Sequence, residues 1–215
     1  MLDADDMEGH AVSGDRSIEF FDQQFAKQVR QTDLGLNPFE QAALPHLRGR
    51  VLDYGCGMGQ LSLAAARAGC TVVALDASRV AVQHLQQLAD AEGLPIKANV
   101  ADLRNHRLDD VFDTVVSIGL LMFFDCQTAA NALSELEAHL RPGGTIVVNV
   151  LVEGTTYMDM FDPQAFCLFE RDALFRRYAS WEILSAAHSD FPAPGGLVKS
   201  FATVIARKPS HAGVT

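Results

Sequence analysis

Runs of β-branched and apolar residues alternate along the chain with stretches whose apolar residues recur every three or four positions. The first pattern is typical of buried strands, and the second is typical of helices that cover a sheet. Gly69 and Gly93 stand where two of the helical stretches should end. Strands are predicted at 51–54, 70–76, 96–100, 112–119, 145–152, 181–187 and 199–207, and helices at 17–30, 37–46, 61–68, 81–89, 129–140 and 171–179.

The order of these elements predicts an α/β fold with a doubly wound, mainly parallel sheet. Strand and helix alternate without an internal repeat, and the run 145–152 is almost continuously apolar, as in a strand that is buried on both faces. The loop 191–196 is too short to contain a crossover helix. The last two strands should therefore pair antiparallel.

A turn with three glycines at alternate positions follows the first predicted strand. Gly55, Gly57 and Gly59 come after Asp53 and lead into a predicted helix, so backbone N–H groups at the helix start would face a ligand. This spacing differs from the G-x-G-x-x-G of dinucleotide folds. Asp53 and the three glycines together resemble motif I of the class I S-adenosylmethionine-dependent methyltransferases, and this resemblance implies an S-adenosylmethionine site. A dinucleotide site and a plain tight turn are the alternatives.

Carboxylates also follow the second and third predicted strands. Asp76 ends the second strand and can accept hydrogen bonds from both hydroxyls of an adenosine ribose. Its alternative role is to cap the next helix, which Ser78 could do instead. Asp102 can accept from an adenine amino group with Leu103 against the ring, or it can simply form a turn.

The N-terminal region is predicted to be a polar tail, 1–16, followed by a helical segment, 17–47. Phe21 and Phe25 fall at helical spacing there and either pack in the core or form a lid over the cofactor. Asn37 and Glu40 form a capping-box pattern around a proline. The predicted organisation continues with a cofactor-binding core at 48–152, substrate-side elements with the terminal hairpin at 153–208, and a tail at 209–215, all in one domain at 17–208.

Composition limits the partners. The 215 residues carry a formal net charge of −10 and show no basic cluster, which argues for a small-molecule substrate and against nucleic acid. No apolar run is long enough to span a bilayer, and the polar N-terminus does not resemble a signal peptide. The four widely spaced cysteines predict neither disulfides nor a metal site, so a cytoplasmic location is expected. The chain is expected to be a monomer or a homodimer.

The glycine turn with its acids, the segment 140–144 and the terminal hairpin together resemble class I S-adenosylmethionine-dependent methyltransferases over residues 17–208. The resemblance implies a Rossmann-like seven-stranded sheet with an antiparallel final strand. It also implies S-adenosylmethionine as cofactor and S-adenosylhomocysteine as product. The cofactor-binding residues that we expect are Asp53, Gly55, Cys56, Gly57, Asp76, Ala77, Asp102, Leu103, Ser117, Ile118 and Gly119.

Segments 121–123, 175–182 and 201–208 narrow the resemblance to the bacterial tellurite-resistance methyltransferases, which methylate small soft nucleophiles, oxyanions among them. The sequence differs from that family at two positions. The family is expected to carry a His-Arg pair, but here Ser189 follows His188. It is also expected to carry an arginine before the last strand, where this chain has glycines. The implied activity is methyl transfer to a tellurite- or selenite-like oxyanion, a thiol or a related small molecule. An oxidoreductase that uses a dinucleotide and a non-catalytic S-adenosylmethionine-binding module are the alternatives.

Candidate catalytic and substrate residues each have a structural alternative. His188 could move a proton or hold an anion, or it could lie on the surface at a strand end. Arg176 and Arg177 could hold an anionic substrate, or they could form the exposed last turn of a helix. Cys126 and Cys167 are expected to be buried thiols rather than ligands for a metalloid. The expected substrate contacts are Phe21, Phe25, Met122 and Tyr157, any of which could instead be a core residue.

Overall fold

A single seven-stranded sheet organises the computed structural model, which describes residues 35–210 of the chain. The strand order is β3-β2-β1-β4-β5-β7-β6, with β7 antiparallel to both of its neighbours and the remaining pairs parallel. The strands are β1 Arg50–Tyr54, β2 Thr71–Asp76, β3 Ile96–Val100, β4 Phe112–Ile118, β5 Leu140–Leu151, β6 Glu182–Ala193 and β7 Leu197–Arg207. The predicted α/β class, the doubly wound sheet and its antiparallel final strand are thereby confirmed.

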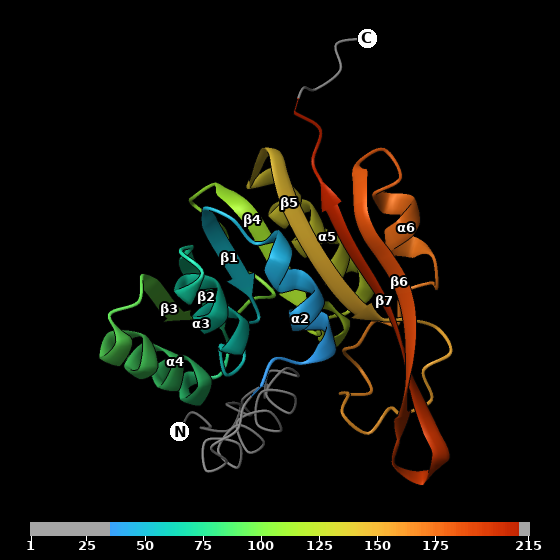
Figure 1. The fold of residues 1–215 in the computed structure, drawn as a ribbon. Helices are drawn as coiled ribbons and strands as arrows, with labels where there is room; N and C mark the ends of the chain where they lie inside the picture. Colours follow the sequence, from blue (N-terminus) through green and yellow to red (C-terminus); the bar gives the residue numbers. More distant parts are fainter. Residues whose placement is uncertain (1–34, 211–215) are drawn as a thin grey trace, which may run out of the picture.

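Helices cover both faces of this sheet (Figure 1). One core cluster packs α5 against alternate residues of β1, β4 and β5, such as Leu52 and Val148. A second cluster packs α2, α3 and α4 against the opposite face, where Val51 and Val147 point. The helices of the described residues are α2 Pro38–Ala43, α3 Gln60–Arg67, α4 Arg79–Glu92, α5 Cys126–Ala138 and α6 Ala173–Arg177, with 3-10 turns η1 Leu44–His46, η2 Leu121–Phe123 and η3 Pro194–Gly196.

Two helix starts follow the predicted capping chemistry. The Asn37 side chain accepts from the N–H of Glu40, and the Glu40 carboxylate accepts from the N–H of Asn37 at 2.8 Å, so the capping box is complete. Ser78 caps α4 by accepting from the N–H of Ala81. Because Ser78 has this role, Asp76 is not needed as the cap of that helix.

The prediction that the cysteines form no disulfide is wrong for one pair. Cys126 begins α5, Cys167 lies in the segment 153–169, and the two form a disulfide across a sequence separation of 41. The fold brings them together because this segment passes beside η2, where the N–H of Cys167 donates to the carbonyl of Met122 at 3.0 Å. Cys56 and Cys70 are buried free thiols.

Other expectations lie partly beyond the described residues. Phe21, Phe25 and the part of the predicted helical segment 17–47 up to residue 34 lie outside the described residues, so the domain boundaries proposed for that region stay predictions. Between residues 35 and 210, no helix has the length and apolar character that crossing a membrane requires.

The disulfide gives a direct test of the fold. Replacing Cys126 and Cys167 together by serine should lower the free energy of unfolding by about 2–4 kcal/mol, because the loop they close is long. Denaturant titration of both proteins measures this difference. Alkylation of the denatured, unreduced wild type should label two of the four cysteines, and labelling of all four would show that the disulfide is absent.

Candidate active site

The glycine turn after β1 has a backbone that only glycine accommodates easily. Gly55, Gly57 and Gly59 all have positive φ angles, of 88°, 50° and 74°. A Cβ atom on Gly59 would lie 2.5 Å from the Leu85 side chain, and one on Gly55 would lie 2.9 Å from Leu120. The turn therefore packs closely against its neighbours while it leads into α3, for which Gly59 is the N-cap.

Asp76 ties this turn to the end of β2. One of its carboxylate oxygens accepts from the N–H of Gly57, and the other accepts from the N–H of Ser78, each at 2.8 Å. An ionised carboxylate offers about four acceptor sites. Asp76 can therefore hold the turn and still accept hydrogen bonds from a ligand.

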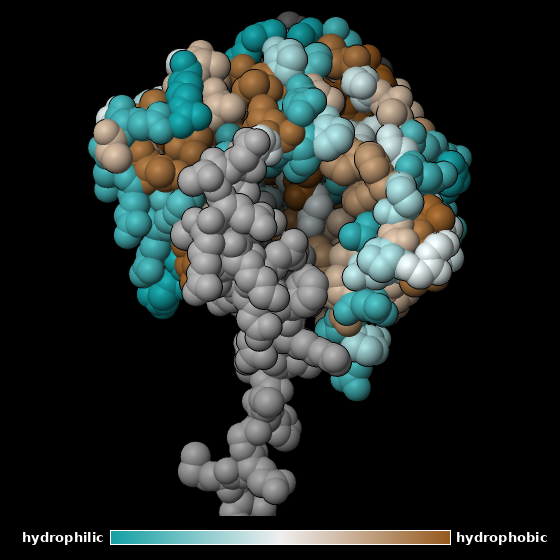
Figure 2. Space-filling model, turned by 60° about the horizontal axis from the view of Figure 1, so that its bottom comes forward, coloured by the Kyte–Doolittle hydropathy of each residue, from teal (hydrophilic) through white to brown (hydrophobic). Residues whose placement is uncertain are grey.

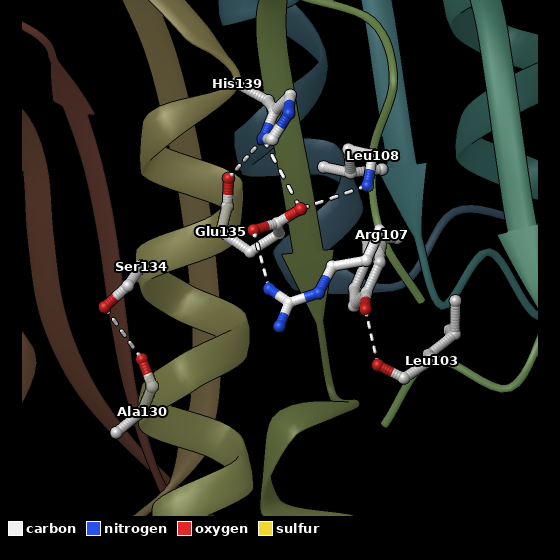
Figure 3. A network of polar contacts seen from close by, with 8 residues as sticks. Leu103, Arg107, Leu108, Ala130, Ser134, Glu135 and His139 are labelled. Atoms are coloured by element: carbon white, nitrogen blue, oxygen red, sulfur yellow. Dashed lines mark hydrogen bonds and ion pairs between the residues drawn. The ribbon is translucent and has the colours of Figure 1, made fainter. Parts of the chain in front are cut away.

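A network of polar contacts holds the loop that follows β3 (Figure 3). The Glu135 carboxylate on α5 accepts from the N–H of Leu108 at 3.1 Å and from Arg107 at 3.2 Å, and it lies 3.7 Å from His139. These contacts, the Leu108 N–H first, lower the pKa of Glu135. The Tyr54 hydroxyl also donates to the carbonyl of Leu103. The loop is thus fixed at both ends, and this fixes the position of Leu103.

These elements enclose a cavity of about 560 Å³, here called cavity 1, at the carboxyl edge of the parallel strands. Figure 2 looks onto the face to which that edge belongs and shows hydrophobic and polar residues around its central hollow. The described acidic residues of the lining outnumber its one basic residue, Arg104, which pairs with Asp102. The acidic lining residues are Glu40, Asp53, Asp76, Asp102, Asp125 and Asp162.

Asp53 is the most strongly perturbed of these acids. Burial is the largest cause that raises its pKa, and the charges of Glu40 and Asp76 also raise it, while the hydrogen bond from Ser62 at 2.6 Å lowers it. The net result is a pKa of about 7. Burial also raises the pKa of Glu40. A negative potential at the floor of cavity 1 is therefore a property of the fold, and a cation bound there would stabilise the ionised form of Asp53.

A second cavity of about 220 Å³, cavity 2, adjoins the first. Asn37, Ile118, Gly119 and Phe123 line both. Its other walls come from α2, η2, β5, β7 and the segment 153–169. They are formed by Phe39, Met122, Asn149, Leu151, Met160, Lys199 and Phe201.

The structure brings the expected cofactor residues together. All of them line cavity 1 except Ser117, which is fully buried in β4 and does not reach the lining. Of the expected substrate residues, Met122 lines cavity 2, and Tyr157 lies beside it with its ring 4.7 Å from the Lys199 ammonium. Their roles as ligand contacts remain predictions.

The three expected catalytic residues lie away from both cavities. Arg176 pairs with Glu170, and Arg177 pairs with Glu137 at 2.6 Å. His188 faces α6, where its Nε2 lies 2.8 Å from the Arg171 carbonyl and its ring lies 4.6 Å from Phe175. None of the three lines either cavity within the described residues, and each has contacts with other parts of the fold. Their catalytic role remains a prediction.

Sequence reasoning also missed several lining residues. Glu40 and Asn37 were recognised only as a helix cap, although both line cavity 1. Asn149 and Lys199 lie inside predicted strands, where a polar residue gives no sign of which cavity it faces. An asparagine within an otherwise apolar strand was the one available signal, because buried polar groups usually serve a partner.

One known protein family matches the part of the chain that contains much of this site. Residues 51–144 match a family described as a methyltransferase domain. These residues contain the glycine turn, Asp76, Asp102 and most of the other residues that line cavity 1. The family match therefore covers most of cavity 1 and only part of cavity 2.

Three relatives match a longer part of the chain. Hemagglutinin 1 of Eikenella corrodens is 29% identical over 74% of this chain and 55% of its own length. A probable S-adenosyl-L-methionine-dependent methyltransferase, TehB, of Haemophilus influenzae is 26% identical over 74% of this chain and 57% of its own. Cypemycin N-terminal methyltransferase of Streptomyces is 32% identical over 74% of this chain and 60% of its own.

The crystal structure of TehB from Haemophilus influenzae has the same fold. It superposes with a TM-score of 0.70 at 23% identity, covering 87% of this chain and 67% of TehB. The chain spans little more than half the length of the curated relatives it matches. Residues 51–144 of this chain thus match the methyltransferase-domain family, and the chain is similar in sequence and fold to the probable S-adenosyl-L-methionine-dependent methyltransferase TehB.

Proposed function

We propose that this chain transfers a methyl group from S-adenosylmethionine, held in cavity 1, to a small molecule held in cavity 2. The observation that carries the proposal is the junction of the two cavities at Asn37, Ile118, Gly119 and Phe123. A methyl donor and its acceptor must meet in line with water excluded, and a shared wall of this kind allows that.

The residues of cavity 1 fit S-adenosylmethionine. Asp76 retains acceptor capacity for the ribose hydroxyls, and Asp102 with Leu103 lies on the neighbouring loop for the adenine. Gly55 and Gly57 line the cavity without side chains, so a ligand can approach the backbone of the turn. S-adenosylmethionine supplies a methyl group already activated on a positively charged sulfur, and the protein's own task is to bind and orient it.

Charge supports the same assignment. The acids around cavity 1 include Asp53 and Glu40, whose burial is unfavourable while no cation is present. S-adenosylmethionine carries a sulfonium and an ammonium group, and S-adenosylhomocysteine lacks the first of these. An acidic cavity therefore favours the substrate form over the product form electrostatically.

The acceptor is proposed to be a small molecule. The net charge of −10 supports this over a nucleic acid, and the 220 Å³ of cavity 2 suits a small body. The family resemblance implied a soft or anionic nucleophile, such as a thiol or a tellurite-like oxyanion. That class has lost part of its support, because His188, Arg176 and Arg177 do not line cavity 2.

The first prediction concerns Asp76. Asp76→Ala should weaken binding of S-adenosylmethionine and S-adenosylhomocysteine by at least tenfold, since a hydrogen bond to a charged group contributes about 1.5–3 kcal/mol. Isothermal titration calorimetry measures this. Asp90→Ala, at an exposed position of α4, is the control and should bind as the wild type does. Unchanged affinity of Asp76→Ala, or tight binding of NADH in place of S-adenosylmethionine, would reject the site.

The second prediction concerns the pH dependence of Asp53. Its pKa in the folded protein, about 7, is above its ordinary value of 3.8, so the folded state holds more protons than the unfolded state between these pH values. The free energy of unfolding should therefore fall as pH rises from about 4 to 7, and Asp53→Asn should remove at most about 4 kcal/mol of that fall.

Binding the cationic cofactor should also ionise Asp53. Calorimetry at about pH 6 in buffers of different ionisation enthalpy should show a proton released by the wild type. Asp53→Asn should release none, and neither protein should release one well above pH 8. Equal proton release by both proteins at pH 6 would show that Asp53 does not meet the cofactor's charge.

A further inference from the structure

One buried polar atom of cavity 2 lacks a partner within the described residues. Asn149 lies on β5, is fully buried and lines cavity 2. Its Nδ2 donates to Thr203 Oγ1 at 2.9 Å, on the neighbouring strand. Its Oδ1 accepts no hydrogen bond there. A buried acceptor left in this state costs about 1–3 kcal/mol, so a ligand that donates to Oδ1 would remove an existing penalty.

The bond to Thr203 fixes which atom of the amide is available. Asn149 is paired directly with Thr203 in the β5–β7 register, and its backbone carbonyl accepts from the N–H of Gly119 at the wall shared by both cavities. The Asn149 side chain is thus held by Thr203 of β7, and its backbone is held by Gly119 at the end of β4. Oδ1 is therefore positioned as a hydrogen-bond acceptor beside the point where donor and acceptor molecules would meet.

The rest of cavity 2 contains no group to act as a base. Its lining within the described chain has no carboxylate and no histidine, and Lys199 is its one ionisable side chain. The Lys199 ammonium lies over the Tyr157 ring. An asparagine cannot take a proton at ordinary pH, so the nucleophile must react without losing its proton first.

Apolar and aromatic side chains define the remaining shape. Phe39 and Phe201 lie with ring centroids 4.8 Å apart, and Met122 and Met160 supply adaptable apolar surface. The positive charge of Lys199 disfavours a cationic ligand nearby. A ligand for this cavity is therefore uncharged at its reacting end, carries a hydrogen to donate, and has a small apolar body.

We propose that the methyl acceptor of this chain is a neutral primary or secondary amine on an apolar or aromatic body, oriented in cavity 2 by an N–H donated to Asn149 Oδ1. The inference rests on the proposed methyl transfer and adds the class of its acceptor. A neutral amine meets both requirements. Its N–H can donate to Asn149, and its nitrogen lone pair can attack without a base removing a proton first.

The step balances without a further reactant. The nitrogen lone pair forms the new N–C bond while the C–S bond of the sulfonium breaks and its electron pair goes to sulfur. The product ammonium then gives its proton to water. Because Asn149 requires an N–H, a primary amine can be methylated twice, and the tertiary amine that results is not a substrate.

Benzylamine is a suitable probe, with N-methylbenzylamine, N,N-dimethylbenzylamine, benzyl mercaptan, tellurite and selenite beside it. The wild type should methylate the first two, with a rate that rises with pH as the amine becomes neutral. N,N-dimethylbenzylamine should give no quaternary product. Binding of benzylamine without any cofactor, followed by nuclear magnetic resonance line broadening, supplies a readout that does not depend on turnover.

Asn149→Leu tests the residue, because leucine has a similar volume and no acceptor. It should lower kcat/KM for benzylamine at least tenfold and weaken benzylamine binding in the absence of cofactor. Its affinity for S-adenosylhomocysteine should stay within threefold of the wild type. Asn131→Leu, at an exposed position of α5, is the control and should change none of these. An equal loss of cofactor affinity and amine binding would assign Asn149 a purely structural role and overturn the proposal.

The remaining outcomes separate the two levels of inference. Methylation of tellurite, selenite or the thiol with no binding or methylation of the amines would overturn the amine assignment and leave methyl transfer standing. Absence of turnover with every probe, together with no binding of S-adenosylmethionine, would overturn the proposed function itself. Full activity of Asn149→Leu towards benzylamine would reject the role of Asn149.

Discussion

The Asp76 carboxylate makes the contact on which the site depends. It accepts from Gly57 in the glycine turn and from Ser78 at the start of α4, so one side chain connects the ends of β1 and β2. The turn can come this close because its three glycines have positive φ and no Cβ. A side chain at Gly59 would collide with Leu85 of α4, which would separate α4 from the turn and disturb Asp76 with it. Backbone shape and ligand chemistry are therefore set by the same few contacts.

The two cavities differ sharply in charge, and this difference divides the chemistry between them. Cavity 1 gathers carboxylates in a partly buried space, at the cost that appears as the raised pKa of Asp53. Cavity 2 has an apolar lining, one amide and one lysine among its described residues. This difference suits the proposed arrangement, in which a positively charged methyl donor lies in cavity 1 and an uncharged acceptor lies in cavity 2.

Much of the fold and the cofactor side could be predicted from the sequence, because both follow from local rules. The glycine turn, the acids at the strand ends and the apolar periods each report on their own neighbourhood, and parallel strands bring their carboxyl ends to one edge. The substrate side depends on tertiary contacts that no local pattern encodes. His188 was expected at the end of the strand 181–187, but it lies inside β6, and whether it faces a cavity or α6 depends on how β6 pairs at the edge of the sheet. Asn149 was missed for the same reason.

The disulfide shows how tertiary structure completes the substrate side. Cys126 follows Asp125, which lines cavity 1, and Cys167 follows the stretch that contributes Met160, Asp162 and Ala165 to the two linings. The segment 153–169 has no helix and only isolated bridges, and separate backbone hydrogen bonds from Thr156, Cys167 and Phe169 join it to β7, η2 and β5. A covalent link at its end therefore limits how far these walls can move apart. The shape of cavity 2, and with it the position of an acceptor at Asn149, depends on a bond between two residues that periodicity alone assigned to separate, unrelated elements.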